Sequence, residues 1–257
     1  DESDDGDESD GRPPESARFV RPCRDATGMK TTGGTDDQKR RAAERAAELV
    51  SSGATVGLGT GSTAAFAIRA LGRAVADGAD VRGVATSFAS RELAREVGIP
   101  LVSLDEVSTV DVAIDGADQL DADLNLIKGG GAAHAREKIV DAMADRFVVV
   151  ADPSKVTETL DRTVPLEVLP DARTAVAARV ETLGGEATLR RADRKDGPVV
   201  TDNGNLVLDC AFGAVADPAS LATDLSATPG VVEHGLFVGV ADEAYVGTDD
   251  GVDVRRP

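Results

Sequence analysis

The stretch TVGLGTGST at residues 55–63 joins a short apolar segment to a glycine turn and a helix start, and it decides the fold class. Residues 55–58 are typical of a short buried strand, and the run from Ala64 to Leu71 is typical of a buried helix. Strands and helices continue to alternate up to about residue 150. This alternation indicates a parallel sheet with helices on both faces. We therefore expect an α/β, Rossmann-like fold with a mostly parallel sheet.

The other elements of this sheet are expected on both sides of that stretch. The predicted helices cover residues 37–50 and 91–97, and the predicted further strands cover residues 81–85, 99–102, 110–114 and 147–150. In such sheets ligands bind beyond the carboxyl ends of the strands. The turns that follow predicted strands should therefore gather at one edge, and they lie at residues 59–63, 86–87, 115–118 and 152–155.

From Thr163 onward the pattern changes to the order β-α-β-β-α-β, which is that of a ferredoxin-like unit. We expect a small α+β second domain without chemistry of its own, acting as a lid or an oligomer contact. The segments 236–240 and 244–246 are expected to return to the first sheet. The predicted division is an acidic tail at 1–35, a catalytic α/β domain at 36–162 and 236–257, and the small domain at 163–235.

The chain carries a strong negative charge, with 46 Asp and Glu against 28 Lys and Arg and a net charge of −18. Such a surface repels phosphate backbones, so a nucleic-acid partner is not expected. No run approaches the roughly 18 apolar residues of a membrane span, so a membrane partner is not expected either. An Asp-rich, Lys-poor surface resembles that of proteins from salt-loving cells, where concentrated salt screens the repulsion. The scarcity of lysine makes Lys39, Lys128 and Lys155, which lie next to motifs, informative.

The first 28 residues are acidic and show no periodicity, which is typical of a disordered tail. Met29 begins a stretch that reads like a natural start, so we expect residues 1–28 to be an upstream translation artefact. The alternative is a solubilising tail. The two cysteines, Cys23 and Cys210, give neither a disulfide framework nor metal-ligand spacing, which predicts a reducing cytoplasm.

Lys128-Gly129-Gly130-Gly131 precedes a predicted helix that carries Glu137. Glycine amides and a helix start can converge on an anion. An ammonium, these amides and a carboxylate around one space can stabilise an oxyanion while a proton moves. The alternative is a glycine-rich helix entry with a solvated Lys and Glu.

The glycine turn at residues 59–63 offers amides and hydroxyls to a phosphate at a helix start. It lacks the third glycine of a dinucleotide fingerprint and the ending of a nucleotide P-loop. A tight turn without a ligand and a methyltransferase glycine loop remain alternatives.

Asp115-Gly116-Ala117-Asp118 ends an apolar strand and places two carboxylates at the same edge. They could bind sugar hydroxyls or move protons between oxygens. The alternative is an acidic surface loop. His134 and His234 have no partners at metal-ligand spacing, so we expect no metal, and a helix-surface or packing role is preferred for His134.

Together these motifs resemble ribose-5-phosphate isomerase, type A, in their order and spacing. The resemblance runs from about Lys39 to Val254 and includes the later motifs at residues 200–205 and 229–232. It implies an aldose–ketose isomerase that interconverts D-ribose 5-phosphate and D-ribulose 5-phosphate through an enediolate in the pentose phosphate pathway. It further implies that no cofactor is used and that the protein is a homodimer or homotetramer.

The resemblance also implies roles for individual residues. Glu137 is the expected base, assisted by Lys128, Asp115 and Asp118. The expected substrate contacts are Lys39, Thr60, Gly61, Ser62, Thr63, Asp115, Gly116, Ala117, Asp118, Lys128, Gly129, Gly130, Gly131 and Lys155. One departure is Gln119, where the family commonly has Glu.

Two rival functions remain open. One is a non-catalytic sugar-phosphate sensor, and the other is a different sugar-phosphate isomerase or a deaminase on the same fold. The Lys-Gly-Gly-Gly loop paired with Arg-Glu-Lys argues against a deaminase, and the presence of a base favours catalysis over sensing.

Overall fold

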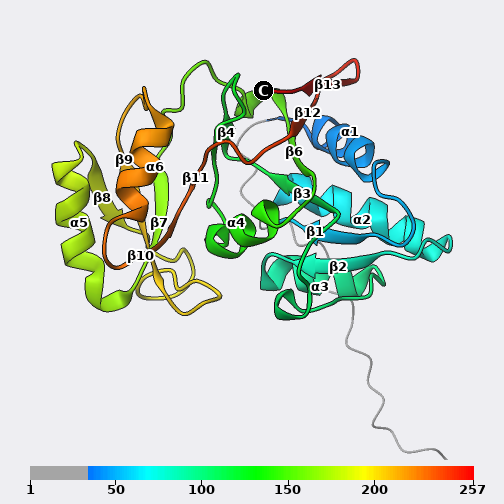
Figure 1. Cartoon of the computed structure of the whole chain (residues 1–257), viewed down its shortest axis with the longest axis horizontal. Coiled ribbons are helices and arrows are strands. Elements are labelled where there is room, and N and C mark those ends of the chain that lie inside the picture. Colours follow the sequence, from blue (N-terminus) through cyan, green and yellow to red (C-terminus); the bar gives the residue numbers. More distant parts are fainter. Residues whose placement is uncertain (1–33) are drawn as a thin grey trace, which may run out of the picture. The chain divides into compact units, whose positions relative to one another are not determined.

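The structure is a computed structural model, and it describes residues 34–257 (Figure 1). These residues belong to one compact unit. The expectations for the acidic tail, for the start at Met29 and for Cys23 fall outside the described residues.

The central element is a six-stranded sheet with the strand order β13-β12-β6-β3-β1-β2. All neighbours pair in parallel except β12 and β13, which are antiparallel, so the prediction of a mostly parallel sheet is confirmed. The strands are β1 (Thr55–Leu58), β2 (Arg82–Ala85), β3 (Val112–Gly116), β6 (Phe147–Ala151), β12 (Glu243–Gly247) and β13 (Val252–Arg255).

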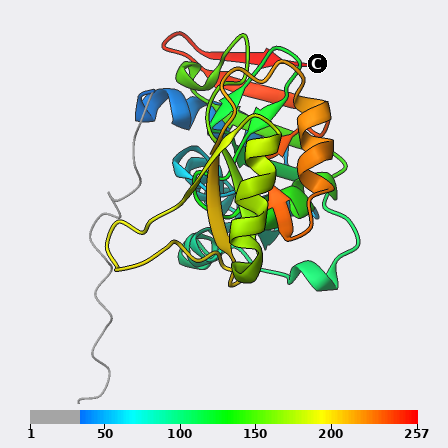
Figure 2. The ribbon, with the colours of Figure 1, turned by 90° about the vertical axis from the view of Figure 1, so that its left-hand side faces the viewer.

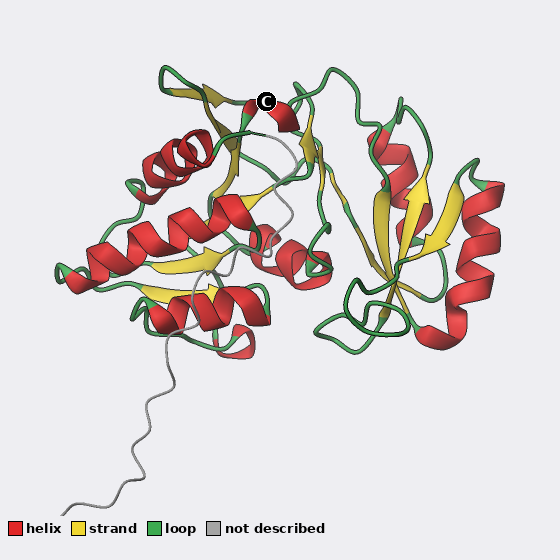
Figure 3. Cartoon of the chain, turned by 180° about the vertical axis from the view of Figure 1, so that it is seen from behind, coloured by secondary structure: helices red, strands yellow, loops and turns green. Residues whose placement is uncertain are grey.

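The two faces of this sheet are covered differently (Figure 3). Ile114 and Val148 pack on helices α1 and α2, whereas the alternate residues Ala113 and Val149 pack on the opposite side, because successive strand residues point to opposite faces. Helix α3 joins α2 on the first side. The opposite side is covered by α4 and by a small sheet with the order β11-β5-β4. These elements are α1 (Asp36–Ala47), α2 (Ser62–Ala76), α3 (Phe88–Glu96), α4 (His134–Ala142), β4 (Gln119–Leu120), β5 (Leu126–Ile127) and β11 (Leu236–Phe237).

Two predicted strands of the main sheet are wrong. Residues 99–102 make only a single bridge, from Leu101 to Gly83, because Pro100 has no N–H for a ladder and a 3-10 turn follows at Leu104–Glu106. The segment after residue 235 forms β11, which pairs with β5 of the three-stranded sheet and not with the main sheet.

Residues 164–234 form a four-stranded antiparallel sheet with the order β10-β7-β9-β8, and the predicted β-α-β-β-α-β order is confirmed. Helices α5 and α6 pack on one face of this sheet (Figure 2), and Leu166, Leu208 and Val176 belong to the core between them. The division of the chain into domains stays a prediction. The elements are β7 (Val164–Val168), α5 (Arg173–Thr182), β8 (Glu186–Leu189), β9 (Leu206–Ala211), α6 (Pro218–Ser226) and β10 (Val231–His234), with 3-10 turns at Pro153–Lys155 and Pro170–Ala172.

Cys210 is fully buried in the core of the four-stranded sheet, and burial raises the pKa of its thiol to about 12. Within residues 34–257, no helix is both long and apolar enough to cross a membrane.

Candidate active site

The turns that follow four parallel strands meet at one edge of the main sheet, as expected. Leu58 at the end of β1 pairs with Ala85 of β2 and with Ile114 of β3. Gly116 of β3 pairs with Val150 of β6. The strand ends are therefore level, and the turns behind them face a common space.

Close packing at this edge explains the glycine at position 59. A Cβ atom there would lie 2.2 Å from Oδ1 of Asp115, so only glycine fits. The same oxygen of Asp115 accepts hydrogen bonds from the N–H of Thr60 at 2.9 Å and from the N–H of Gly116 at 2.6 Å. Asp115 thus fastens the glycine turn to the end of β3.

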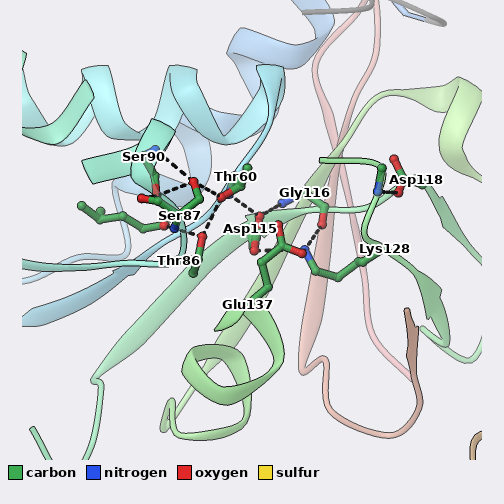
Figure 4. A network of polar contacts seen from close by, with 11 residues as sticks. Thr60, Thr86, Ser87, Ser90, Asp115, Gly116, Asp118, Lys128 and Glu137 are labelled. Carbon is green, nitrogen blue, oxygen red and sulfur yellow. Dashed lines mark hydrogen bonds and ion pairs between the residues drawn. The ribbon is translucent and has the colours of Figure 1, made fainter. Parts of the chain in front are cut away.

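A hydroxyl network, formed by Thr60, Thr86, Ser87 and Ser90, lies on one side of the edge (Figure 4). Oγ1 of Thr60 is 2.8 Å from Oγ1 of Thr86 and donates to Oγ of Ser87 at 2.7 Å. The hydroxyl of Thr86 also donates to the carbonyl of Leu58, and Ser87 is bonded to Ser90. The network holds the turns after β1 and β2 together.

Helix α2 begins directly beside this network. Gly61 is its N-cap with φ 121°, a conformation that favours glycine, and it provides no side-chain cap. The first turn of α2 carries Ser62 and Thr63, whose backbone N–H groups therefore have no side-chain acceptor from the cap. An uncapped helix start with a positive dipole end suits an anion such as phosphate.

An acid–ammonium cluster, formed by Asp115, Lys128 and Glu137, lies on the other side of the edge (Figure 4). Nζ of Lys128 is 3.0 Å from Oδ2 of Asp115 and 3.6 Å from Oε2 of Glu137, and it donates to the carbonyl of Gly116 at 2.5 Å. All three side chains are buried. The structure thus brings together an ammonium and two carboxyl groups from three separate motifs.

Burial and crowding set the protonation of these groups. Burial raises the pKa of Glu137 to about 8, although Lys128 opposes the shift. Burial also opposes the charge on Lys128, but the surrounding carboxyls outweigh it and raise the pKa of the ammonium. A third buried acid, Asp141, lies one helical turn after Glu137, and burial raises its pKa well above the usual value. One ammonium among three acids cannot balance three negative charges, so the cluster retains protons.

The glycine loop, residues 128–131, contacts several other segments of the chain. The N–H of Gly130 donates to Oδ2 of Asp118 at 2.7 Å, so one amide of the loop is occupied by a carboxylate. A Cβ at Gly129, which has φ 99°, would lie 2.7 Å from Nδ1 of His134. The N–H of Lys128 donates to the carbonyl of Gly235 at 2.8 Å.

Three expected substrate contacts make no hydrogen bond or ion pair with these networks within residues 34–257. Lys155 is half-buried after β6, and Lys39 is buried on α1 with Asp36 at 4.0 Å. Within the described part of the chain, no hydrogen bond or ion pair joins either lysine to the acid–ammonium cluster. Ala117 is half-buried and packs on the core beneath the edge.

Contacts in the structure show what the side chains of Gln119 and His134 do. Gln119 bonds to the side chain of Asp161 and accepts from the N–H groups of Asp161 and Arg162, so its side chain serves the segment after β6. His134 is buried, and its Nε2 accepts from the N–H of Glu167 at 3.1 Å, which confirms a packing role. Burial lowers the pKa of His134 to about 3, so the ring is neutral. Among residues 34–257, no group of three or more His, Cys, Asp or Glu side chains is arranged to hold a metal ion.

The later motif at residues 200–205 is built around Glu167 of β7. Oε1 of this buried glutamate accepts from the side chains of Thr201, Asn203 and Asn205. Asp202 accepts from the N–H of Phe88 at 2.7 Å, directly after Ser87 of the hydroxyl network. The motif therefore ties the four-stranded sheet to the edge of the main sheet.

Arg190, which follows β8, belongs to none of the motifs predicted from the sequence. Its Nη1 donates to the carbonyls of Gly129 at 2.8 Å and Gly130 at 3.1 Å. Its other nitrogens bind both carboxylate oxygens of Asp209 on β9. The only signal in the sequence was the alternation along β8 and β9, which places both residues opposite the apolar face.

Comparison with known proteins gives one family. A family model described as ribose 5-phosphate isomerase A (phosphoriboisomerase A) matches residues 82–251. Proteins named ribose-5-phosphate isomerase A from Halorubrum lacusprofundi and Haloarcula marismortui are 67% identical over 239 residues and 69% identical over 223 residues. These alignments cover 89% and 87% of this chain and 100% and 97% of the relatives. Both relatives come from haloarchaea, in agreement with the salt adaptation expected from composition.

Solved structures agree with this result. A ribose 5-phosphate isomerase A from Methanocaldococcus jannaschii is 45% identical with a TM-score of 0.84, and the match covers 87% of this chain and 100% of that one. A D-ribose-5-phosphate isomerase in complex with phospho-erythronic acid is 41% identical with a TM-score of 0.85, covering 88% and 100%.

Proposed function

The chain belongs to the ribose 5-phosphate isomerase A family, and we propose that it interconverts D-ribose 5-phosphate and D-ribulose 5-phosphate with Glu137 as the base. The reaction moves a proton between C2 of the aldose and C1 of the ketose through an enediolate. It requires a base near both carbons and a cationic environment for the enediolate oxygens. This reaction belongs to the non-oxidative part of the pentose phosphate pathway.

The geometry of Glu137 carries the proposal. Its Oε2 is buried, has no hydrogen-bond partner within residues 34–257, and lies 3.6 Å from the ammonium of Lys128. A buried carboxyl oxygen without a partner is costly for stability, which is typical of groups kept for a ligand. With its pKa at about 8, Glu137 can give and take a proton near neutral pH.

The neighbouring groups have complementary proposed roles. Lys128 stabilises the negative enediolate oxygen, and an amide of the glycine loop assists it. Asp115 fixes the position of the ammonium through the contact at 3.0 Å. Asp115 or Asp118 assists ring opening by moving protons between sugar oxygens. Glu137 takes the proton from one carbon and returns it to the other, while a hydroxyl proton passes from the oxygen on C2 of the aldose to the oxygen on C1. Atoms and charge therefore balance without a cofactor.

The phosphate end of the substrate is proposed to bind at the start of α2, on the amides and hydroxyls of residues 60–63. Lys39 and Lys155 would add positive charge there, which an anionic protein needs in order to accept an anionic substrate. The related structure in complex with phospho-erythronic acid, a phosphorylated sugar acid, is compatible with such an anion site.

The test is isomerisation in D2O. Ribose 5-phosphate is incubated with the protein, and NMR follows both ketose formation and deuterium at the exchanged carbon. We expect turnover with solvent deuterium incorporation, and Glu137→Gln should lower kcat by at least about 10³-fold while substrate still binds. Glu181→Gln, on the exposed side of α5, is the matched control and should keep full activity.

Each alternative has its own signature in this assay. A sugar-phosphate sensor would bind ribose 5-phosphate without forming ketose. A deaminase would act on an amino sugar phosphate and leave ribose 5-phosphate unchanged. Near-normal turnover of Glu137→Gln would remove Glu137 from the mechanism.

The oligomeric state and the cellular location stay predictions. We propose a homodimer or homotetramer, which analytical ultracentrifugation in molar KCl would measure. We also propose the cytoplasm as the location, in agreement with the cysteine usage.

A further inference from the structure

The four-stranded sheet presents a polar face toward the glycine loop. Leu208 of β9 and Leu189 of β8 face the core beneath α5 and α6. Since side chains alternate along a strand, the neighbouring Asp209 and Arg190 point to the opposite face. This face meets the turn that carries Gly129 and Gly130.

Arg190 joins the four-stranded sheet to the glycine loop with a fixed geometry. Its guanidinium is held by both oxygens of Asp209, and its Nη1 reaches the carbonyls of Gly129 and Gly130 at 2.8 and 3.1 Å. The side chain is 16% exposed, so solvent screens these contacts little. A planar, bidentate pair of this kind fixes direction as well as distance.

These contacts determine where two amides of the glycine loop point. A peptide is planar and trans, so holding the carbonyl of Gly129 also holds the N–H of Gly130, and holding the carbonyl of Gly130 holds the N–H of Gly131. The N–H of Gly130 donates to Asp118 on the side away from Arg190. The N–H groups of Gly129 and Gly131 have no acceptor among the described residues. Of these two, the N–H of Gly131 belongs to a peptide whose carbonyl Arg190 holds, and it remains able to bind a substrate oxygen.

We propose that Arg190, held by Asp209, is a positioning residue that orients the N–H groups of Gly130 and Gly131 for catalysis. The inference rests on the proposed isomerase function. Arg190 touches neither Glu137 nor Lys128 through any contact within residues 34–257, so it acts through the glycine loop. The four-stranded sheet thereby contributes to the chemistry, contrary to the expectation of a domain without chemistry of its own.

The experiment compares Arg190→Ala with a matched control. Arg179→Ala removes another Arg–Asp pair, between helices α5 and α6, where Arg179 lies 3.5 Å from Asp224. These helices cover the face of the four-stranded sheet opposite Arg190. We expect Arg190→Ala to lower kcat about 10²-fold, because small misplacement of a catalytic group costs about this much. KM should change less than about 3-fold, and Arg179→Ala should leave both constants unchanged.

Chemical rescue separates positioning from a merely structural role. Guanidinium at millimolar concentration fits the space left in Arg190→Ala and should restore kcat at least about 5-fold, without effect on the parent or on Arg179→Ala. Arg190→Lys keeps the charge but lacks the planar fork, so it should retain a kcat defect of about 10-fold with a melting temperature close to that of the parent. Arg190→Lys also serves as the test if Arg190→Ala does not fold.

Each result decides the matter. A kcat within about 2-fold of the parent for both Arg190 variants overturns the proposal. A kcat defect that guanidinium does not relieve, accompanied by a lower melting temperature, also overturns it in favour of a structural role. If the parent chain forms no ketose at all, the proposed function fails instead, and this outcome is distinguishable because it does not involve the variants.

Discussion

The hydroxyl network and the acid–ammonium cluster share one edge of the sheet but differ in how their polar atoms are satisfied. The hydroxyls of Thr60, Thr86 and Ser87 bond to one another and to the backbone. In the acid–ammonium cluster, by contrast, Oε2 of Glu137 and Oδ2 of Asp115 are buried without a hydrogen-bond donor of suitable geometry among the described residues, and only Lys128 faces them.

We interpret this difference as a division of roles: the hydroxyl network positions the substrate, and the acid–ammonium cluster reacts with it. A satisfied network rigidifies the turns that carry the proposed phosphate site. An undersatisfied cluster costs stability and keeps titratable groups with shifted pKa values at the place proposed for proton transfer. Asp115 links the two groups, because its Oδ1 accepts from the N–H of Thr60 and its Oδ2 forms an ion pair with Lys128. Three variants and one pH profile test this division of roles.

After Glu137→Gln, the largest effect is expected for Lys128→Met, which removes the cation of the cluster but keeps the length of the side chain. The enediolate oxygen loses its charged donor, so kcat should fall about 10²- to 10³-fold. Steady-state kinetics measure the fall in kcat. Lys195→Met, in an exposed loop, is the control. A kcat within a few-fold of the parent would assign the oxyanion to the glycine amides alone.

The pH dependence of kcat/KM comes next. A base must be deprotonated, and the pKa of Glu137 in the free protein is raised to about 8, so kcat/KM should rise almost tenfold per pH unit below 8 and level off above it. The substrate phosphate, with a second pKa near 6, is already a dianion in most of this range. A profile that is flat from pH 6.5 to 9 would contradict the protonated state inferred for the cluster.

A smaller effect is expected on the hydroxyl side. Thr60→Val keeps the shape but removes the hydroxyl that joins Thr86 and Ser87, at a cost typical of one hydrogen bond. We expect KM to rise about 2- to 10-fold with kcat nearly unchanged. Thr223→Val, at an exposed position of α6, is the control. A loss confined to kcat would show that the hydroxyl network acts on the reaction step and not only on substrate binding.

The smallest effect concerns stability and comes from Asp141, whose two carboxyl oxygens have no partner within residues 34–257. Burial raises its pKa well above 3.8, so the folded state binds the proton more tightly than the unfolded state. The stabilisation is complete below pH 4 and is lost as the pH rises toward the folded-state pKa. Asp141→Asn does not titrate, so its melting temperature should exceed that of the parent at pH 8 by a few degrees, which is about 1 kcal/mol for a chain of this size.

Calorimetry at pH 4 and pH 8 in constant salt checks the sign of this effect. The advantage of Asp141→Asn should shrink toward pH 4, and the exposed variant Asp196→Asn should show none at either pH. A stabilisation that grows toward pH 4 would mean that Asp141 is ionised in the folded protein.

The sequence predicts the motif-bearing half of the molecule well because its signals are local. The apolar runs that form β1, β3 and β6 are bounded by glycine or aspartate turns, and parallel pairing then brings those turns to one edge without further information. The roles assigned to Glu137 and the other site residues remain predictions.

The remaining features depend on contacts between distant segments. Nothing near Arg190 in the sequence indicates Gly129, since their bond spans 61 positions and exists only because two sheets meet. Strand β11 has two residues, and its pairing with β5 is fixed by the path of the backbone rather than by a periodic pattern. Likewise, Pro100 ended a predicted strand because pairing needs donors as well as apolar side chains.

The bond from the N–H of Lys128 to the carbonyl of Gly235 has a consequence for biosynthesis. Position 235 follows the last strand of the four-stranded sheet, so the lysine backbone reaches its final tether only after that whole sheet has been synthesised. A nascent chain that stalls before residue 235 thus contains every motif of the proposed active site yet lacks the support behind its cation. The tether makes synthesis through residue 235 a precondition for a properly seated Lys128.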